Sequence, residues 1–202
     1  STYSVCTVIA GLEAAAKLAE ATSHPADASE WRRAAAGYRA QLDKLCVPDG
    51  AFSKGFLLSD DGTPEPDDTL DISSLYGPFM FAGLPLDDKR MQRTLHAVHD
   101  RLYNSSPIGG VIRYENDNYF LAKQQYQGNP WIVCTLWLAQ YLLAVQRGQD
   151  AKDLLDWALA RRMSSGVLSE QFDPEDGTAL SVAPLVWSHA ELVNTLLDLY
   201  KL

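Results

Sequence analysis

The spacing of apolar residues along the chain predicts an all-α protein. Apolar residues recur every three or four positions, the period of a helix with one buried face. We expect seven helices, over residues 3–21, 27–46, 71–81, 87–103, 130–146, 150–163 and 184–201. The segment 130–146 is apolar on nearly every side, which predicts a helix with neighbours all around it. Strand patterns are weak, and only Gly110–Tyr114 indicates a short hairpin arm.

The connections between the predicted helices alternate in length. Short ones lie near residues 22–26, 82–86 and 147–149, and long ones cover about 47–70, 104–129 and 164–183. In an up-and-down array of helices, alternate connections emerge at the same end, so we expect the three long loops to meet. Loops of this length in a compact domain are often functional, and these are rich in aromatic and charged residues. We therefore expect the active site at the end of the molecule where the three long loops meet.

Composition narrows the possible partners. The chain has 202 residues, enough for one domain with a sizeable core, and we see no second domain. Its formal net charge of -9 disfavours nucleic acid and anionic membranes as partners, and fits a neutral substrate. No apolar run approaches the length of a membrane span, and no signal-peptide pattern is present. Cys6, Cys46 and Cys134 are odd in number and widely spaced, which predicts free thiols in the reducing cytoplasm.

Five short motifs carry the chemical information. They are 71–77 (Asp-Ile-Ser-Ser-Leu-Tyr-Gly), 109–117 with its Arg-Tyr-(x)2-Asp step, 128–131 (Gly-Asn-Pro-Trp), 169–171 (Ser-Glu-Gln) and 184–190 with Trp-Ser-His-Ala. In this order and at this spacing they resemble glycoside hydrolase family 15, which includes glucoamylases, glucodextranases and a branch of trehalases. The resemblance covers essentially all 202 residues. The stretch Phe120–Gln127 departs from the fungal members by its greater length and is closer to the bacterial and archaeal ones.

The resemblance implies a fold and a place in it. The family fold is an (α/α)6 barrel, and residues 1–202 would be the C-terminal portion of its catalytic domain, a truncated part holding the last seven helices. In the family, the general-acid glutamate lies in a Trp-Glu-Glu step just upstream of the segment that resembles Ser1–Leu12, and nothing in this chain matches that step. An open barrel edge along the first helix, with Val5, Val8 and Ile9, predicts a homodimer or capture of a complementing N-terminal chain.

The resemblance also implies roles for individual residues. Inverting hydrolysis of a glycosidic bond needs one carboxylic acid to protonate the leaving oxygen and one carboxylate to activate water. Glu170 resembles the family's general base. Arg113 resembles the arginine that grips the innermost sugar, and its planar group of five donors suits paired hydroxyls. Trp131, Tyr114 and Tyr119 complete the expected substrate-binding set, and no cofactor or metal is implied.

Several interpretations remain open at this point. We expect the intact parent to be a glucoamylase-like enzyme acting on an α-glucan or oligosaccharide, with starch-like glucan, isomalto-oligosaccharide and trehalose all open as substrates. The isolated chain, without the general acid, would be inactive. The alternative is a non-catalytic sugar-binding or complementing fragment, and a helical array without a ligand is a third possibility. His189 is expected to be structural, and the His96 and His99 pair lacks a third metal ligand at a matching spacing.

Overall fold

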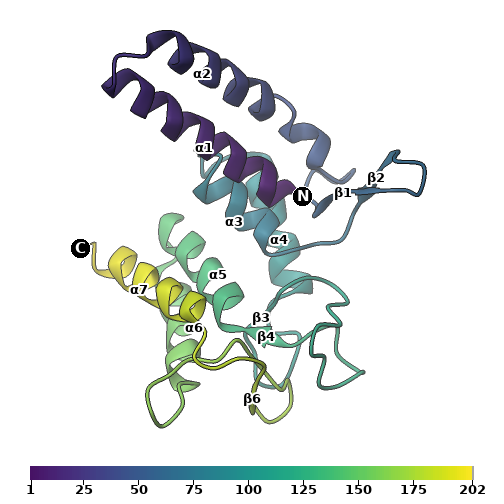
Figure 1. The fold of residues 1–202 in the computed structure, drawn as a ribbon. Helices are drawn as coiled ribbons and strands as arrows, with labels where there is room; N and C mark the ends of the chain where they lie inside the picture. The colour runs from purple at the N-terminus through teal and green to yellow at the C-terminus, as the bar shows by residue number, and fades with distance from the viewer. Residues whose placement is uncertain (202) are drawn as a thin grey trace. The chain divides into compact units, whose positions relative to one another are not determined.

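The structure, a computed structural model, describes residues 1–201 and divides into two compact units (Figure 1). The first unit comprises residues 1–69 and 73–95, and the second comprises 70–72 and the chain from 96 onward. Seven α-helices occupy the described residues, as predicted. They are α1 (Thr2–Ala21), α2 (Pro25–Arg39), α3 (Ser73–Met80), α4 (Lys89–Arg101), α5 (Ile132–Ala144), α6 (Gly148–Ala160) and α7 (Val186–Tyr200). The division falls within α4, so each unit is described by itself.

Small residues let the helices of the first unit approach closely. Helices α1 and α2 lie side by side (Figure 1) around buried Ala16, Ala19 and Ala28. Helix α3 also packs on α1, and a Cβ on its Gly77 would lie 3.1 Å from the Cα of Tyr3. Because the contacting side chains are small, the helices can pack with little space between their backbones.

Two features of the first unit differ from the sequence prediction. Helix α2 ends at Arg39, and the buried leucines that follow lie on a short 3-10 helix, η1 (Leu42–Leu45). Their apolar spacing continues that of α2, so the pattern does not reveal the break. A hairpin of β1 (Gly55–Leu58) and β2 (Pro64–Asp67) was not predicted. Most of its side chains are exposed, so it lacks the alternation that identifies a strand.

Helix α5 forms the core of the second unit. Every residue from Ile132 to Leu142 is buried, as the all-round apolar pattern predicted. Helices α6 and α7 both pack against it (Figure 1). The core they form includes Ile132, Leu136, Leu155, Ala158, Leu168 and Phe172. A helix buried on this scale is a rigid base for the loops attached to its ends.

A small antiparallel sheet joins the long loops of the second unit. Its strands are β3 (Val111–Ile112), β4 (Pro130–Trp131), β5 (Gln171–Phe172) and β6 (Ala179–Leu180), paired in that order. Trp131 pairs with Val111 on one side and with Gln171 on the other. The sheet therefore confirms that the second and third long loops meet. Only the arm at Gly110–Tyr114 was indicated by the sequence, since a strand of two residues shows no periodicity.

The end of the first long loop pairs with the residues that follow β3. The N–H of Ile72 donates to the carbonyl oxygen of Arg113 at 3.0 Å, and the N–H of Glu115 donates to that of Leu70 at 3.1 Å. Asp71 and Tyr114 form an isolated β-bridge between these two bonds. The backbone on both sides of Tyr114 is thus fixed by hydrogen bonds to Leu70–Ile72.

The segment that leads into β3, residues 108–110, packs against the ring of Trp157 on α6. Trp157 Nε1 and Arg161 Nη2 each donate to the carbonyl oxygen of Ile108 at 2.7 Å. Gly110 follows with φ +84, and a Cβ there would lie 2.4 Å from Cζ2 of Trp157. This close approach requires glycine and sets the direction from which the chain enters β3.

Replacing Gly110 with alanine therefore destabilises the fold through two effects, backbone strain and a clash with Trp157. Gly166 is the matched control, because its φ is +83 but nothing lies within 4 Å of the added Cβ. Both variants carry the cost of an L-residue in the left-handed region. Gly110→Ala should lose about 1–3 kcal/mol more free energy of unfolding than Gly166→Ala, because it alone overpacks. Urea unfolding measures the difference, and equal losses would contradict the close packing on Trp157.

Candidate active site

The guanidinium of Arg113 is fixed by a buried aspartate. Its Nε and Nη2 donate to the two carboxylate oxygens of Asp117, each at 2.8 Å. Asp117 is only 1% exposed, and its Oδ1 also accepts the backbone N–H of Tyr119 at 3.0 Å. A two-point bond between planar groups fixes orientation as well as distance. Nη1 donates to no residue within the described range 1–201, so it is the guanidinium nitrogen available to a ligand.

Three aromatic rings surround the same guanidinium. The Cζ of Arg113 lies 4.5 Å from the ring centroid of Trp131, 4.8 Å from that of Tyr114 and 5.1 Å from that of Tyr119. Such contacts attract a cation to the ring faces. Trp131 is only 3% exposed, so in this structure its ring contacts Arg113 and offers a ligand little open surface. Tyr119 is 45% exposed and provides more accessible aromatic surface than Trp131.

The protonation states of this group are set by burial and by Asp117. Burial lowers the pKa of Arg113, but the hydrogen bond and the negative charge of Asp117 outweigh it, and the pKa is raised overall. Burial, followed by the charge of Asp117, raises the pKa of the Tyr114 phenol. At neutral pH the site therefore holds a permanent cation at Arg113 and a protonated phenol at Tyr114.

Glu170 lies directly before β5, held by its backbone on both sides. Its N–H donates to the carbonyl oxygen of Val182 at 3.0 Å. Its own carbonyl oxygen accepts the N–H of Ile132, the first residue of α5, at 3.2 Å. The side chain is half-buried, and its Oε2 accepts a hydrogen bond from Nε2 of Gln171 at 3.2 Å. One carboxylate oxygen is thus oriented by the protein.

A chain of buried amides sets that orientation. Nδ2 of Asn129 donates to Oε1 of Gln171 at 2.7 Å, which leaves Nε2 of Gln171 to donate to Glu170. Gln171 is fully buried and Asn129 nearly so. Oδ1 of Asn129 accepts the N–H of Ala122, so the Asn129 amide also has only one orientation that satisfies its partners. Both residues lie in the motifs that resemble the family; the sequence suggested Asn129 or Pro130 as the start of the next helix, and it assigned neither Asn129 nor Gln171 a part in orienting Glu170. Their only signal was a polar residue beside a strongly apolar segment.

The Trp-Ser-His-Ala block at the start of α7 forms hydrogen bonds with the two residues that precede Glu170. The hydroxyl of Ser188 donates to the carbonyl oxygen of Ser169 at 2.9 Å. The N–H of Leu168 donates to Nε2 of His189 at 3.0 Å. This contact agrees with the structural role expected for His189. Two adjacent helix residues therefore position the two residues that precede Glu170.

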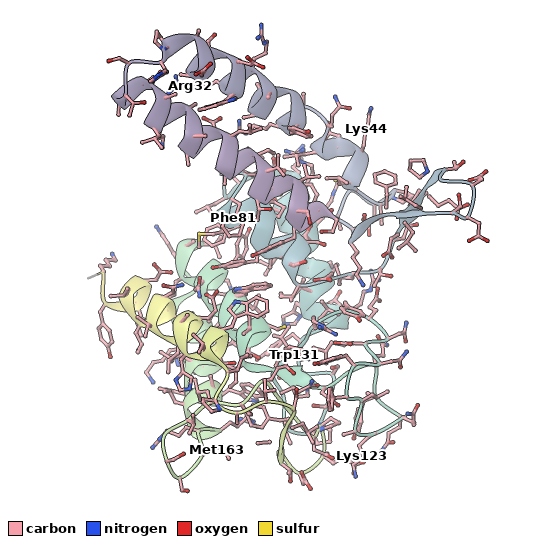
Figure 2. The ribbon with its side chains drawn as sticks, in the orientation of Figure 1. Arg32, Lys44, Phe81, Lys123, Trp131 and Met163 are labelled. Carbon is pink, nitrogen blue, oxygen red and sulfur yellow. The ribbon has the colours of Figure 1, made fainter. Side chains whose placement is uncertain are left out.

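The structure brings the predicted site residues together within one unit. Tyr114, Tyr119 and Trp131 surround Arg113. Trp131, labelled in Figure 2, pairs in the sheet with Gln171, the residue that follows Glu170. In the part of the chain that the structure describes, no three His, Cys, Asp or Glu side chains are arranged to hold a metal ion. Over the same residues, none of the helices is both long and apolar enough to cross a membrane.

Comparison with known proteins identifies the class. The fold resembles that of glycosidases: a bacterial glucoamylase solved in complex with acarbose matches with a TM-score of 0.84 over 100% of this chain, at 21% identity. The glucoamylase of Hypocrea jecorina matches over 100% of this chain with a TM-score of 0.78, at 18% identity. The model of the glycosyl hydrolases family 15 matches residues 1–161 and 144–197. The chain belongs to this family, and its fold is part of the (α/α)6 barrel.

The curated relatives are longer proteins. An uncharacterised glycosyl hydrolase of Methanocaldococcus jannaschii is 30% identical over 93% of this chain and 30% of its own length. A trehalase of Mycolicibacterium smegmatis is 27% identical over 94% of this chain and 26% of its own length. The chain therefore spans less than a third of the length of the curated relatives it matches.

Removing the carboxylate of Asp117 should lower the free energy of unfolding far more than removing the carboxylate of an exposed arginine–aspartate pair. Asp117→Ala leaves the partly buried Arg113 without its partner, at a cost of about 3–5 kcal/mol in the free energy of unfolding. Asp150→Ala is the matched control, because its pair with Arg147 is exposed on both sides and is worth at most about 1 kcal/mol. Guanidinium chloride unfolding measures both. Similar losses would show that the Arg113 pair does not organise the site.

Proposed function

We propose that this chain carries the general base and part of the sugar-binding site of an inverting α-glucoside hydrolase. Glu170 is the base, and the supporting observation is its orientation by Gln171 and Asn129 at the edge of the site that holds Arg113. A carboxylate that activates water must be aimed at the anomeric carbon, so a fixed oxygen is the feature the reaction requires. The general acid belongs to the upstream part of the family's catalytic domain.

The sugar-binding role falls to Arg113 and the tyrosines. Arg113 is oriented by Asp117 and keeps Nη1 for a ligand, while the ring of Tyr114 packs against the guanidinium. Donors held in place before binding cost little ordering entropy when a sugar arrives. Tyr119 presents an exposed ring beside them, and the buried ring of Trp131 packs against the guanidinium. No cofactor enters this mechanism.

The substrate is an α-glucoside. Glucoamylases among the solved structures and trehalases among the curated relatives both act on such bonds by name, and they leave the linkage open. We favour a glucoamylase-like preference for α-glucan or oligosaccharide, on the Gly-Asn-Pro-Trp form of residues 128–131. Maltose, isomaltose and trehalose, assayed side by side, decide between the three.

Glu170→Gln tests the assignment in a longer protein that includes the family's upstream acid. The amide keeps the size of the side chain but cannot take a proton, so kcat should fall by roughly 10²–10⁴-fold while substrate binding changes little. Glu30→Gln, on the exposed surface of α2, is the control and should leave kcat and substrate binding unchanged.

The 202-residue chain alone should release glucose more slowly than the longer protein, by a similar factor, because it lacks the general acid.

The outcomes separate the proposal from its rival. Retained turnover in Glu170→Gln would show that another group is the base. Fast hydrolysis by the 202-residue chain would reject the division of acid and base between segments. Sugar binding without turnover in the longer wild-type protein would establish the alternative, a non-catalytic sugar-binding fragment.

An exposed apolar stripe on α7 supports an association with another chain. Val186, Val193, Leu197 and Tyr200 are spaced along one face of α7, and between 42% and 78% of each is exposed. The first helix, where the open edge was expected, buries Ile9 and exposes Val8. We propose that the 202-residue chain by itself forms a homodimer through the α7 stripe, which a complementing N-terminal chain would displace.

Sedimentation at micromolar concentration tests the stripe. The wild-type chain should sediment as a dimer, and Leu197→Lys should shift it to monomer because the charge would be buried in the contact. Met163→Lys is the control, since Met163 is equally exposed but lies outside α7. A wild-type chain that remains a monomer, or an equal shift in both variants, would reject the dimer.

The cysteines support a reducing location. Cys6, Cys46 and Cys134 are all free, and burial raises the pKa of Cys6 to about 12 and that of Cys46 to about 11. These thiols are poor nucleophiles and have a structural character. We propose that the protein works in the cytoplasm.

A further inference from the structure

The loop after Asp117 exposes an aromatic ring on an unusually constrained backbone. Phe120 has φ +52, in the left-handed region that bulky residues rarely adopt. Its carbonyl oxygen accepts Nδ2 of the buried Asn129 at 2.8 Å, and the N–H of Ala122 donates to Oδ1 of the same residue at 3.2 Å. The loop is therefore held in this conformation from the protein interior, and the cost of the positive φ is offset by these bonds.

The side chain that this backbone presents is left largely uncovered. Phe120 is 60% exposed. A single exposed apolar side chain is ordinary on a protein surface, so exposure alone carries no weight. Here it coincides with a conformation that Asn or Gly would adopt more easily. Replacing the ring with a small polar residue would relieve both costs, so its presence points to a function for the ring.

Phe120 continues the aromatic series that begins at the site. Its ring packs edge-to-face on Tyr119, with centroids 4.8 Å apart, and Tyr119 lies 6.0 Å from Trp131. Exposure rises along this series from 3% at Trp131 through 45% at Tyr119 to 60% at Phe120. The rings thus extend outward from the guanidinium of Arg113 toward the surface.

The loop is also braced at its far side. Nζ of Lys123 lies 3.3 Å from a carboxylate oxygen of Glu175, and Nε2 of Gln125 donates to Glu175 at 2.6 Å. Glu175 belongs to the turn between β5 and β6, and Lys123 is labelled in Figure 2. The loop with Phe120 and the strand next to Glu170 are thereby joined into one wall. A platform fixed at both ends loses little freedom when a ligand binds.

We propose that Phe120 is a sugar-stacking residue that binds the next glucose unit outward from the one held by Arg113. A glucose ring has an apolar face of C–H groups that packs on an aromatic ring, while its hydroxyls point to the sides. The proposal rests on the proposed function, because it requires α-linked glucose in the site. It assigns to Phe120 the preference for oligosaccharide over free glucose.

Phe120→Asn in the 202-residue chain tests this proposal. Asparagine tolerates the left-handed backbone, so the variant keeps the loop and removes only the ring. Isothermal titration with maltotriose should show a loss of about tenfold in affinity, while affinity for glucose stays unchanged. Phe120→Trp should retain maltotriose binding. Phe56→Asn, at an exposed phenylalanine of the β1–β2 hairpin, is the matched control and should change neither.

The possible results distinguish the stacking role of Phe120 from the proposed function on which it rests. Equal affinity of wild type and Phe120→Asn for maltotriose would overturn the stacking role and leave the proposed function standing. Equal loss for glucose and maltotriose would also overturn it, because Phe120 would then act on the inner sugar. A wild-type chain that binds neither sugar would overturn the sugar-binding part of the proposed function together with the stacking role, while the turnover of Glu170→Gln in the longer protein tests the general base separately.

Discussion

The side-chain amide of Asn129 joins the two loops from which the candidate site is built. Its Nδ2 donates to the carbonyl oxygen of Phe120 and to Oε1 of Gln171, and its Oδ1 accepts the N–H of Ala122. Each of these bonds is buried or partly buried, where an unpaired polar atom costs about 1–3 kcal/mol. Because all three are made in only one orientation of the amide, the orientations of the Gln171 amide and of the Glu170 carboxylate follow from it.

This arrangement depends on a rigid support. Asn129 directly precedes β4, and β4 leads straight into α5, whose residues Ile132–Leu142 are buried throughout. The Ser188 and His189 contacts anchor the Glu170 segment from α7, which packs on the same core. The positions of the candidate site residues are therefore set by close-packed helices, while the residues themselves lie on loops and short strands.

The sequence predicted the helices well because their signal is periodic and long. It predicted the meeting of the second and third long loops from connection lengths alone, and the sheet β3–β6 confirms it. It did not predict that sheet beyond the arm at Gly110–Tyr114, nor the end of α2 at Arg39, because two-residue strands and a shift to a 3-10 helix leave no distinct pattern. The roles of Asn129 and Gln171 were also beyond it, since a buried amide pair is defined by contacts between distant segments.

The central claim is that Glu170 activates a water molecule for attack opposite the leaving group. The anomer first released from an α-linked glucan by the longer protein tests it most directly. Proton NMR, recorded before mutarotation equilibrates the product, distinguishes the two anomers of glucose. We predict β-glucose, because a base acting through water inverts the anomeric carbon. Initial release of α-glucose would mean that the reaction retains configuration, and would contradict the role of Glu170 as general base.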